Sequence, residues 1–452
     1  MSIGPRPGNS RMAIRDAFGL AFSGATEAGF APYGQAVREL QCFIGDPVKS
    51  IDRAIAQDPG FVMAQVFKGY LFGLATEPEA TAVARTCHEA ALPLAATTRE
   101  RAHVSALGNL ANGHWHQASG ILRDIAIDFP LDAVALQVGH QVDFFTGNAR
   151  MLRDRIARAL PSWQADMPGY HAILGMQAFG LEEMAEYAQA ERLGRTAVEI
   201  EPRDGWAQHA VAHVMEMQSR QRDGIAWMRT DPEAWTKESF LQVHNWWHLA
   251  LFHYDLGETG EVLALYDGPI YGARSTLALN MVDASAILWR LHLGGVDVGD
   301  RWTALAANWV PKASGSNYAF NDAHAMMAFV GAGLDAPART LLEAQREAML
   351  GGDDNAAFTR DVGHPLTLAI KSFGEGNYAE TIRLIRPIRA IAHRFGGSHA
   401  QRDVIDLTLI EAALRVGDGA LARALTTERS TARPDSPLSA LFLRRAADLS
   451  EN

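Results

Sequence analysis

The sequence predicts an all-α fold, an α-α superhelix of about ten helix pairs that curls tightly around its inner face. Three apolar helix ends are each followed by an acid and a proline, at Pro59, Pro130 and Pro202, which are separated by 71 and 72 residues. Proline stops one helix and leaves the chain free to begin the next. Alternating valine-rich patterns typical of strands are absent. We therefore expect helices over more than half of the chain and essentially no sheet.

A small residue stands five positions after each of these prolines, at Ala64, Ala135 and Ala207, where a neighbouring helix can pack closely. The spacing of about 72 residues is twice the period of roughly 34 residues that tetratricopeptide repeats show. Each such repeat consists of a first helix A, a short turn and a second helix B. The spacing predicts a tetratricopeptide-like solenoid with one continuous core.

Glycines mark the ends of the other A helices. A glycine just past a helix end adopts the left-handed conformation at little steric cost, and the candidates are Gly147, Gly180, Gly257, Gly333 and Gly376. The last four precede acid-led or alanine-rich stretches that we expect to be B helices, over residues 182–200, 258–268, 336–350 and 377–395.

The chain reads as one domain with short tails. We expect residues 1–11 to form a disordered tail, residues 12–430 to form the solenoid, and residues 431–452 to form a C-terminal helix and tail. No Gly/Ser-rich linker divides the chain. The loosest stretch is residues 310–318, so the alternative architecture is two helical domains joined there.

Composition excludes several classes of protein. The 452 residues are 48% hydrophobic and carry a net charge of −11, whereas nucleic-acid binding needs a basic face. Two cysteines, Cys42 and Cys87, form no disulfide framework or metal-ligand pattern, as in a cytoplasmic protein. No apolar run reaches the ~18 residues that span a membrane. We expect a small-molecule ligand, no nucleic acid and no membrane, and leave a homodimer open.

Histidines gather on the predicted A helices, where eight are found: His171, His209, His213, His244, His248, His324, His364 and His399. Equivalent helices of a solenoid line one surface, so these side chains would converge in space. His209, His213 and Glu216 are spaced i, i+4, i+7. His244 and His248 are spaced i, i+4, which again places both on one helix face.

This pattern predicts a pocket on the inner face. Its catalytic residues would be His209, His213, His244, His248, His324, His399 and Asp403, and its substrate-binding residues His171, Trp206, Glu216, Trp247, Asp322 and Arg402. Structural roles are the alternative. The imidazoles and indoles would then be core packing, Asp322 a helix N-cap, and Arg402 and Asp403 charge partners behind a cap at Ser398.

We do not expect a metal ion at the predicted histidine pocket. Zinc and iron bind imidazoles together with a carboxylate, and His209, His213 and Glu216 offer such a set. The catalytic glutamate of an HExxH motif is missing, and histidine pairs on separate helices need a particular helix spacing to share an ion. We predict no metal and no cofactor.

Five blocks resemble the tetratricopeptide repeat protein 38 family: HAVAHVMEMQSR (209–220), VHNWWHLALFHYDLGE (243–258), LYDGPI (265–270), NDAHAMMAF (321–329) and GGSHAQRDV (396–404). The resemblance runs from about residue 20 to about residue 430. It implies an α-α superhelix of degenerate tetratricopeptide-like units, and it assigns no activity.

For function, we expect an enzyme that acts on a small polar organic molecule through histidine general acid–base chemistry. Arg402 would bind an anionic group of the substrate. Hydrolysis is slightly favoured because it needs no cofactor, and lyase and isomerase chemistry stay open. The alternative is a scaffold that binds a peptide or protein on its concave face. A closed cavity favours the enzyme and an open groove favours the scaffold.

Overall fold

The structure, a computed structural model, describes residues 14–449. Helices account for 74% of it, and the only strands in the described part of the chain are β1 (Ile14–Arg15) and β2 (Ala21–Phe22), which pair antiparallel. The all-α prediction is therefore confirmed. The predicted tail at residues 1–11 lies outside the described residues.

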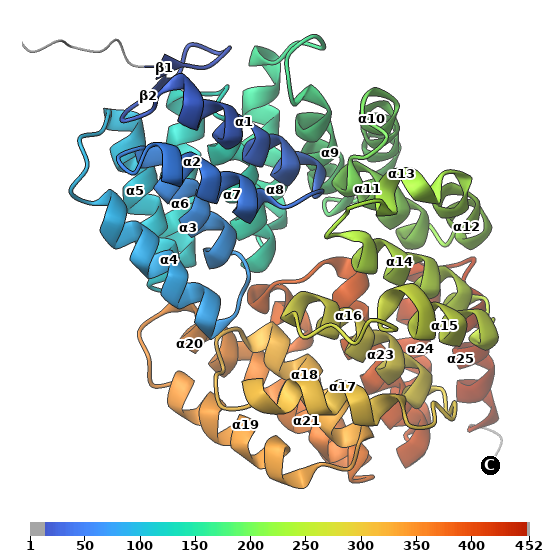
Figure 1. The fold of residues 1–452 in the computed structure, drawn as a ribbon. Coiled ribbons are helices and arrows are strands. Elements are labelled where there is room, and N and C mark those ends of the chain that lie inside the picture. Colours follow the sequence, from blue (N-terminus) through green and yellow to red (C-terminus); the bar gives the residue numbers. More distant parts are fainter. Residues whose placement is uncertain (1–13, 450–452) are drawn as a thin grey trace, which may run out of the picture.

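Helices follow one another in pairs along the chain (Figure 1). The pairs are α1 (Glu27–Cys42) with α2 (Pro47–Gln57), α3 (Val62–Gly73) with α4 (Pro78–Ala91), α5 (Thr98–Ala111) with α6 (Trp115–Asp128), α7 (Ala133–Phe145) with α8 (Ala149–Ala159), α9 (Tyr170–Glu182) with α10 (Tyr187–Ile200), α11 (Gly205–Met217) with α12 (Gln221–Thr230), α14 (Gln242–Asp255) with α15 (Thr259–Leu265), α16 (Ala278–Leu293) with α17 (Arg301–Trp309), α18 (Ala319–Gly331) with α19 (Asp335–Ala348), α21 (His364–Gly374) with α22 (Tyr378–Ile385), and α23 (His399–Val416) with α24 (Gly419–Ala432). Short helices α13 (Pro232–Thr236) and α20 (Asp354–Phe358) lie between pairs, and α25 (Pro437–Asp448) packs on α24.

The first and second helices of a pair differ in burial, which is what a two-layer superhelix requires. Helix α11 is buried at every position from Gly205 to Glu216, whereas α10 buries only Ala190, Gly194 and Ala197. A stripe of that kind, at a spacing of three to four residues, is one face of an amphipathic helix. The first helices therefore form the inner layer, and the second helices cover it.

The helix boundaries predicted from prolines and glycines are mostly confirmed. Ala64, Ala135 and Ala207, which follow the three prolines, are completely buried in first helices. Gly180 is the exception, because α9 continues through it to Glu182. A Cβ atom at Gly180 would lie 2.5 Å from the backbone nitrogen of Arg153, so this glycine permits the close approach of α8 to α9.

Several predicted second helices are shorter than expected. The helix expected over residues 182–200 begins only at Tyr187, and the one expected over 377–395 ends at Ile385. Pro387 cannot donate a helical hydrogen bond, and the chain continues as a 3₁₀ helix over Arg389–Phe395. In 258–268, α15 gives way to a π-helical turn at Tyr266–Ile270 that contains Pro269.

The superhelix closes on itself, because early and late helix pairs contact each other directly. Glu77 accepts a hydrogen bond of 2.8 Å from the backbone nitrogen of Ala278 and also pairs with Lys312. The Tyr318 hydroxyl donates to the carbonyl of Phe145 at 3.0 Å. Figure 1 shows the late helix α20 beneath α4 and α5, and the C-terminal helices beside α14 to α16. Residues 310–318 therefore lie in a closing contact, not in a linker between two domains.

Among residues 14–449, no helix has both the length and the apolar character needed to cross a lipid bilayer.

Candidate functional site

Four histidines from two neighbouring first helices, α11 and α14, form one compact cluster. His209 and His213 lie on α11, and His244 and His248 lie on α14. Neighbouring imidazole centroids are 4.3 to 4.9 Å apart. The Nε2 atoms of His209 and His244 are 3.1 Å apart. One ring nitrogen from each of the four lies within 4.8 Å of the others. The i, i+4 spacing in each helix and the packing of α11 against α14 together produce this arrangement.

Three of the imidazoles are backed by a carboxylate on the side away from the cluster. The Nδ1 atom of His244 is 2.9 Å from Oδ2 of Asp283, which comes from α16. The Nδ1 atom of His248 is 3.1 Å from Oε2 of Glu216. The Nδ1 atom of His213 is 3.4 Å from Oε2 of Glu182, at the end of α9. At His244 and His248 the carboxylate at Nδ1 favours the tautomer that carries its proton there, which leaves Nε2 as an acceptor directed at the cluster.

Burial determines the charge of the cluster. It lowers the pKa of His213 to about 4, and it lowers the pKa of His209 and of His248 well below the usual value, an effect that the neighbouring imidazoles reinforce. These three rings are therefore neutral at pH 7. Burial also raises the pKa of Glu216, and burial together with Glu183 raises the pKa of Glu182.

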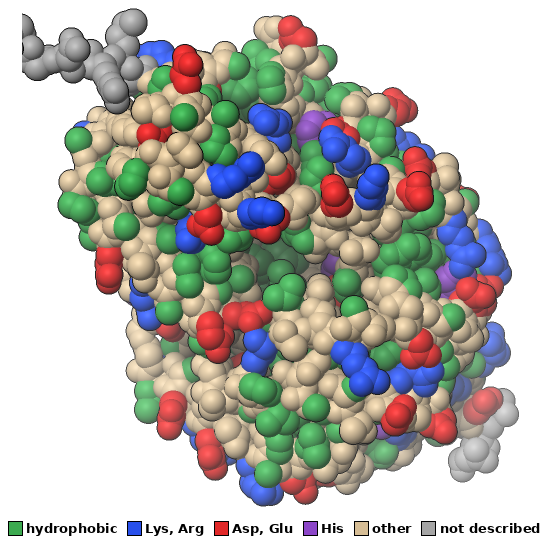
Figure 2. Space-filling view, viewed as in Figure 1, with side chains coloured by type: hydrophobic (Ala, Val, Ile, Leu, Met, Phe, Trp, Pro, Cys, Tyr) green, Lys and Arg blue, Asp and Glu red, His purple; other side chains and the backbone are tan. Residues whose placement is uncertain are grey.

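A cavity of about 130 Å³ adjoins the cluster. Its aromatic lining residues are Phe43, Phe144, Phe145, Trp206, Phe240, Tyr318 and Phe320, and its polar lining residues are Gln141, His209, His244, Asn280, Asp283, Asn321 and Gln401. Phe240 and Leu279 are 45% and 49% exposed and mark the mouth. Figure 2 shows a hollow near the middle of this face, below the N-terminal helices and above α16, with hydrophobic side chains in it.

Several lining side chains carry polar atoms without a hydrogen-bond partner. They are Nε2 of Gln141, Nε1 of Trp206, Nδ1 of His209 and Oδ1 of Asn321, and all four side chains are more than nine-tenths buried. Buried polar groups are normally hydrogen-bonded. Unpaired groups of this kind around one cavity are suited to bind the polar part of a ligand.

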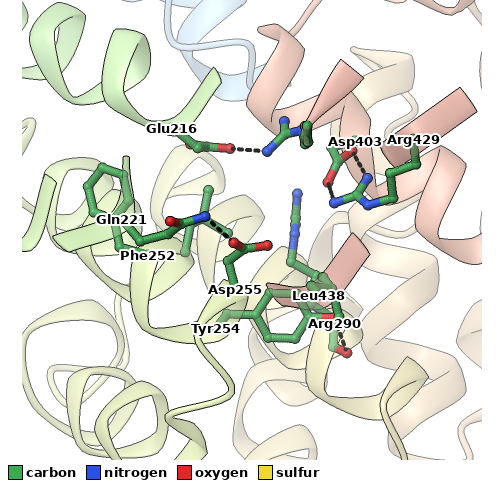
Figure 3. A pocket seen from close by; sticks show the side chains of 11 residues that line it. Glu216, Gln221, Phe252, Tyr254, Asp255, Arg290, Asp403, Arg429 and Leu438 are labelled. Carbon is green, nitrogen blue, oxygen red and sulfur yellow. Dashed lines mark hydrogen bonds and ion pairs between the residues drawn. The ribbon is translucent and has the colours of Figure 1, made fainter. Parts of the chain in front are cut away.

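A second, smaller cavity of about 20 Å³ lies on the other side of Glu216 (Figure 3). Asp403 pairs with Arg429 at 2.6 Å, and Glu216 lies 3.7 Å from Arg433. Figure 3 shows Arg290 projecting between Asp255 and Asp403. Its guanidinium donates to two backbone carbonyls at 2.8 and 3.1 Å. A cavity of this volume holds about one water molecule, so it is a charge-balanced packing region rather than a substrate site.

Of the residues expected to meet in one pocket, His209, His213, His244 and His248 come together in the cluster, and only His209 and His244 of these four line the aromatic cavity. Asp403 is wrong as a cavity residue, since Arg429 binds it on the far side of Glu216. Glu216 itself backs His248 rather than facing the aromatic cavity. Trp206 lines the cavity, whereas Trp247 is completely buried behind it and stacks on His244 at 5.3 Å.

Asp322 and His324 also lie away from the cavity. Helix α18 begins at Ala319, so Asp322 is inside the first turn and not an N-cap. Its carboxylate accepts hydrogen bonds from Ser316 and Gln345, and burial raises its pKa to about 6. The His324 ring donates from Nδ1 to the carbonyl of Phe320 at 2.8 Å and is 4.6 Å from the Phe320 ring, so it supports the cavity wall from behind.

The expected group at the start of α23 has structural roles. Ser398 caps the helix, as expected, in a capping box with Gln401. His399 is 44% exposed and binds Glu183 through its backbone nitrogen. Arg402 donates to the carbonyl of Gly397. The His399 ring also contacts Glu183, with Nε2 3.2 Å from its carbonyl oxygen. Neither His399 nor Arg402 lines the cavity.

The two remaining histidines of the predicted set lie elsewhere. His171 pairs with Asp204 at 2.7 Å and lies 3.9 Å from the Cys42 sulfur, in a separate surface depression. His364 binds Gln345 at 2.9 Å. Both stand at or near helix starts, as expected, but they serve local hydrogen bonding.

The sequence interpretation missed two carboxylates of the site, Asp283 and Glu182. Asp283 is an acid within a run of small and apolar residues, 281–288. A buried charge at such a position requires a partner, and this signal could have been used. Glu182 has no comparable signal, because it is one of two successive acids after an apolar run. The cavity residues Phe43 and Phe240 were missed because they stand outside the first helices.

No protein-family model matches the sequence. Membership of the tetratricopeptide repeat protein 38 family therefore stays a proposal that rests on the five sequence blocks.

Proposed function

We propose that the protein is an enzyme that acts on a small organic molecule bound in the aromatic cavity. The observation that carries the proposal is that His209 and His244 belong both to the cavity wall and to the histidine cluster. A cavity of roughly 150 Å³ holds a benzene ring. The substrate class is therefore a molecule with one ring-sized apolar part and a polar group directed at the histidines.

Hydrolysis is the reaction we favour, because water is the only co-reactant. The water oxygen bonds to an electrophilic acyl carbon of the substrate, and its proton passes to Nε2 of His244. Asp283, at Nδ1, stabilises the imidazolium that forms. The bond from carbon to the leaving group breaks, and the leaving group takes that proton.

The closed form of the superhelix favours this proposal over the peptide-binding scaffold. A scaffold needs an open concave groove, whereas contacts such as those of Glu77 with Ala278 and of Tyr318 with Phe145 join the early helix pairs to the late ones. The cavity of about 130 Å³ matches the size of a small molecule better than that of a peptide.

The test places a large side chain at the cavity mouth. Leu279→Trp is expected to weaken binding of aryl esters and amides of single-ring size by about tenfold or more, measured by calorimetry, and to lower their hydrolysis in parallel. Leu277→Trp is the matched control, since Leu277 is 60% exposed and does not line the cavity. Equal binding by both variants would contradict the proposal.

A further inference from the structure

We infer that His209, His213, His244 and His248 form a binding site for one divalent first-row transition-metal ion. This site goes beyond the proposed function, because the ion would bind without any substrate. The expectation of no metal rested on the spacing of α11 and α14, and that spacing brings one ring nitrogen of each histidine within 4.8 Å of the others.

The distances are close to those of a loaded site. Imidazole nitrogens bind zinc at about 2.0–2.1 Å in tetrahedral geometry, so two ligands of one ion lie roughly 3.4 Å apart. The Nε2 atoms of His209 and His244, at 3.1 Å, are close to this separation. The other ring nitrogens, which lie within 4.8 Å of one another, would turn inward when the ion binds.

The hydrogen-bond state of the cluster also points to an ion. Both ring nitrogens of His213, Nδ1 of His209 and Nε2 of His248 are buried and have no hydrogen-bond partner. Because His244 and His248 direct Nδ1 at carboxylates, their Nε2 atoms are both acceptors and cannot satisfy each other. An ion at the centre would bind the inward lone pairs together.

The carboxylates behind the rings supply a second, independent observation. Asp283, Glu216 and Glu182 stand at Nδ1 of His244, His248 and His213. Ligand histidines in metal sites typically bind a carboxylate through their other nitrogen. Glu182 is completely buried and neither of its oxygens has a hydrogen-bond partner. A cation among the histidines would balance this group.

The donor atoms select the class of ion. Four imidazole nitrogens suit zinc, iron, cobalt, nickel or copper, whereas magnesium and calcium require oxygen ligands. The His244 side chain is 16% exposed and the side chains of His213 and His248 are fully buried. The accessible side of the ion would therefore face the aromatic cavity. If the proposed function holds, the ion would lower the pKa of a water bound there, and because His244 would then be a ligand, the proton of that water would pass to solvent in the cavity.

The test uses the full chain. The protein is stripped with a chelator and titrated with Zn²⁺, Fe²⁺ and Co²⁺, and bound metal is measured by elemental analysis after dialysis. We expect about one ion per chain, and a Co²⁺ spectrum of nitrogen coordination. His248→Asn should lose the ion. His253→Asn is the matched control and should keep it, because His253 is buried on the same helix and binds Glu258 instead.

Asp283→Asn separates loss of the metal from loss of folding, because it leaves all four imidazoles in place. It should weaken the affinity for Zn²⁺ by 10- to 100-fold while circular dichroism stays unchanged. Failure of the folded wild-type chain to retain any of these ions would overturn the inference, as would equal loss in His253→Asn. Metal binding is measured without substrate, and Leu279→Trp tests the cavity without metal. The proposed metal site and the proposed substrate cavity can therefore each fail without the other.

Discussion

His140 illustrates how burial, together with the nearby charge of Arg155, lowers the pKa of a single residue in this protein. Its ring lies between Phe179 and Trp206, with centroids 5.9 and 5.7 Å away, and neither ring nitrogen has a hydrogen-bond partner. Burial lowers its pKa to about 3. The unfolded chain, in which the histidine has its ordinary pKa near 6.5, therefore binds a proton that the folded chain does not bind at mildly acidic pH.

The first prediction follows from that difference in proton binding. Between pH 6.5 and pH 4, His140 makes the free energy of unfolding fall by about 1.4 kcal/mol for each unit that the pH is lowered. His140→Phe should remove this contribution, so its stability should fall less steeply with acid than that of the wild type. Urea unfolding at pH 7, 6 and 5 measures the slopes. His116→Phe, at an exposed position, serves as the control, and a slope for His140→Phe equal to that of the wild type would refute the prediction.

The positions of single residues could be predicted from the sequence where they depend only on spacing within one helix. The pairs His209 with His213 and His244 with His248 share helix faces because helical periodicity is a property of a few residues. Asp283 and Asp403 depend on which helices pack together, and local pattern does not contain that information. Asp283 joins the cluster through the packing of α16 on α14, whereas Asp403 turns to Arg429.

At the scale of helices, pairs are joined by buried polar contacts as well as by apolar stripes. Arg155 on α8 binds Asp143 on α7 at 2.8 Å and donates to the Ser119 hydroxyl on α6 at 2.9 Å. Arg155 and Asp143 are fully buried. Three successive helices are therefore fixed in register by one guanidinium.

A substitution at Arg155 tests this contact. Arg155→Met leaves Asp143 buried without its cation, and removal of one partner of a buried pair costs about 3–5 kcal/mol. Urea unfolding at pH 7 should show a loss of that size. Arg150→Met should be nearly neutral, because Arg150 is on the same helix, is 80% exposed and pairs only with Asp154. Similar stability of the two variants would show that the pair is not important for the helix register.

Helices could be predicted and their ends could not. Acid–proline pairs and glycines identified the pairs because these residues act on their neighbours. Gly180 was wrongly predicted to end a helix, because it instead allows α8 to pack closely against α9. The helix expected up to residue 395 ends at Ile385, because Pro387 cannot donate a helical hydrogen bond.

At the scale of the whole molecule, closure of the superhelix creates the cavity. Lining residues come from α7, α11, α14, α16, α18 and α23 and from the chain after α1 and before α14. The sequence indicated a curled solenoid, but which residues meet after a full turn depends on the accumulated rotation of all the pairs. Small differences in each pair add up, so the closing contacts were not predictable.

Glu77 provides a test of closure. Glu77→Ala removes the acceptor of the Ala278 amide, 201 residues away. Hydrogen exchange at the start of α16 should become about two- to tenfold faster, as expected for one hydrogen bond worth about 0.5–1.5 kcal/mol. Mass spectrometry of peptides covering residues 277–281 measures it. Glu79→Ala, an exposed acid on α4, is the control. Unchanged exchange in Glu77→Ala would mean that the ends are not held together in this way.

Anomalous X-ray diffraction from crystals of the wild-type chain tests most directly whether the histidine cluster holds a metal ion. Data collected on both sides of the absorption edge of the bound metal should give one peak among His209, His213, His244 and His248, about 2.0–2.2 Å from four ring nitrogens. The peak should be absent from crystals of His248→Asn. Four imidazoles linked only to one another, with no anomalous peak in crystals grown with Zn²⁺ present, would contradict the proposed metal site.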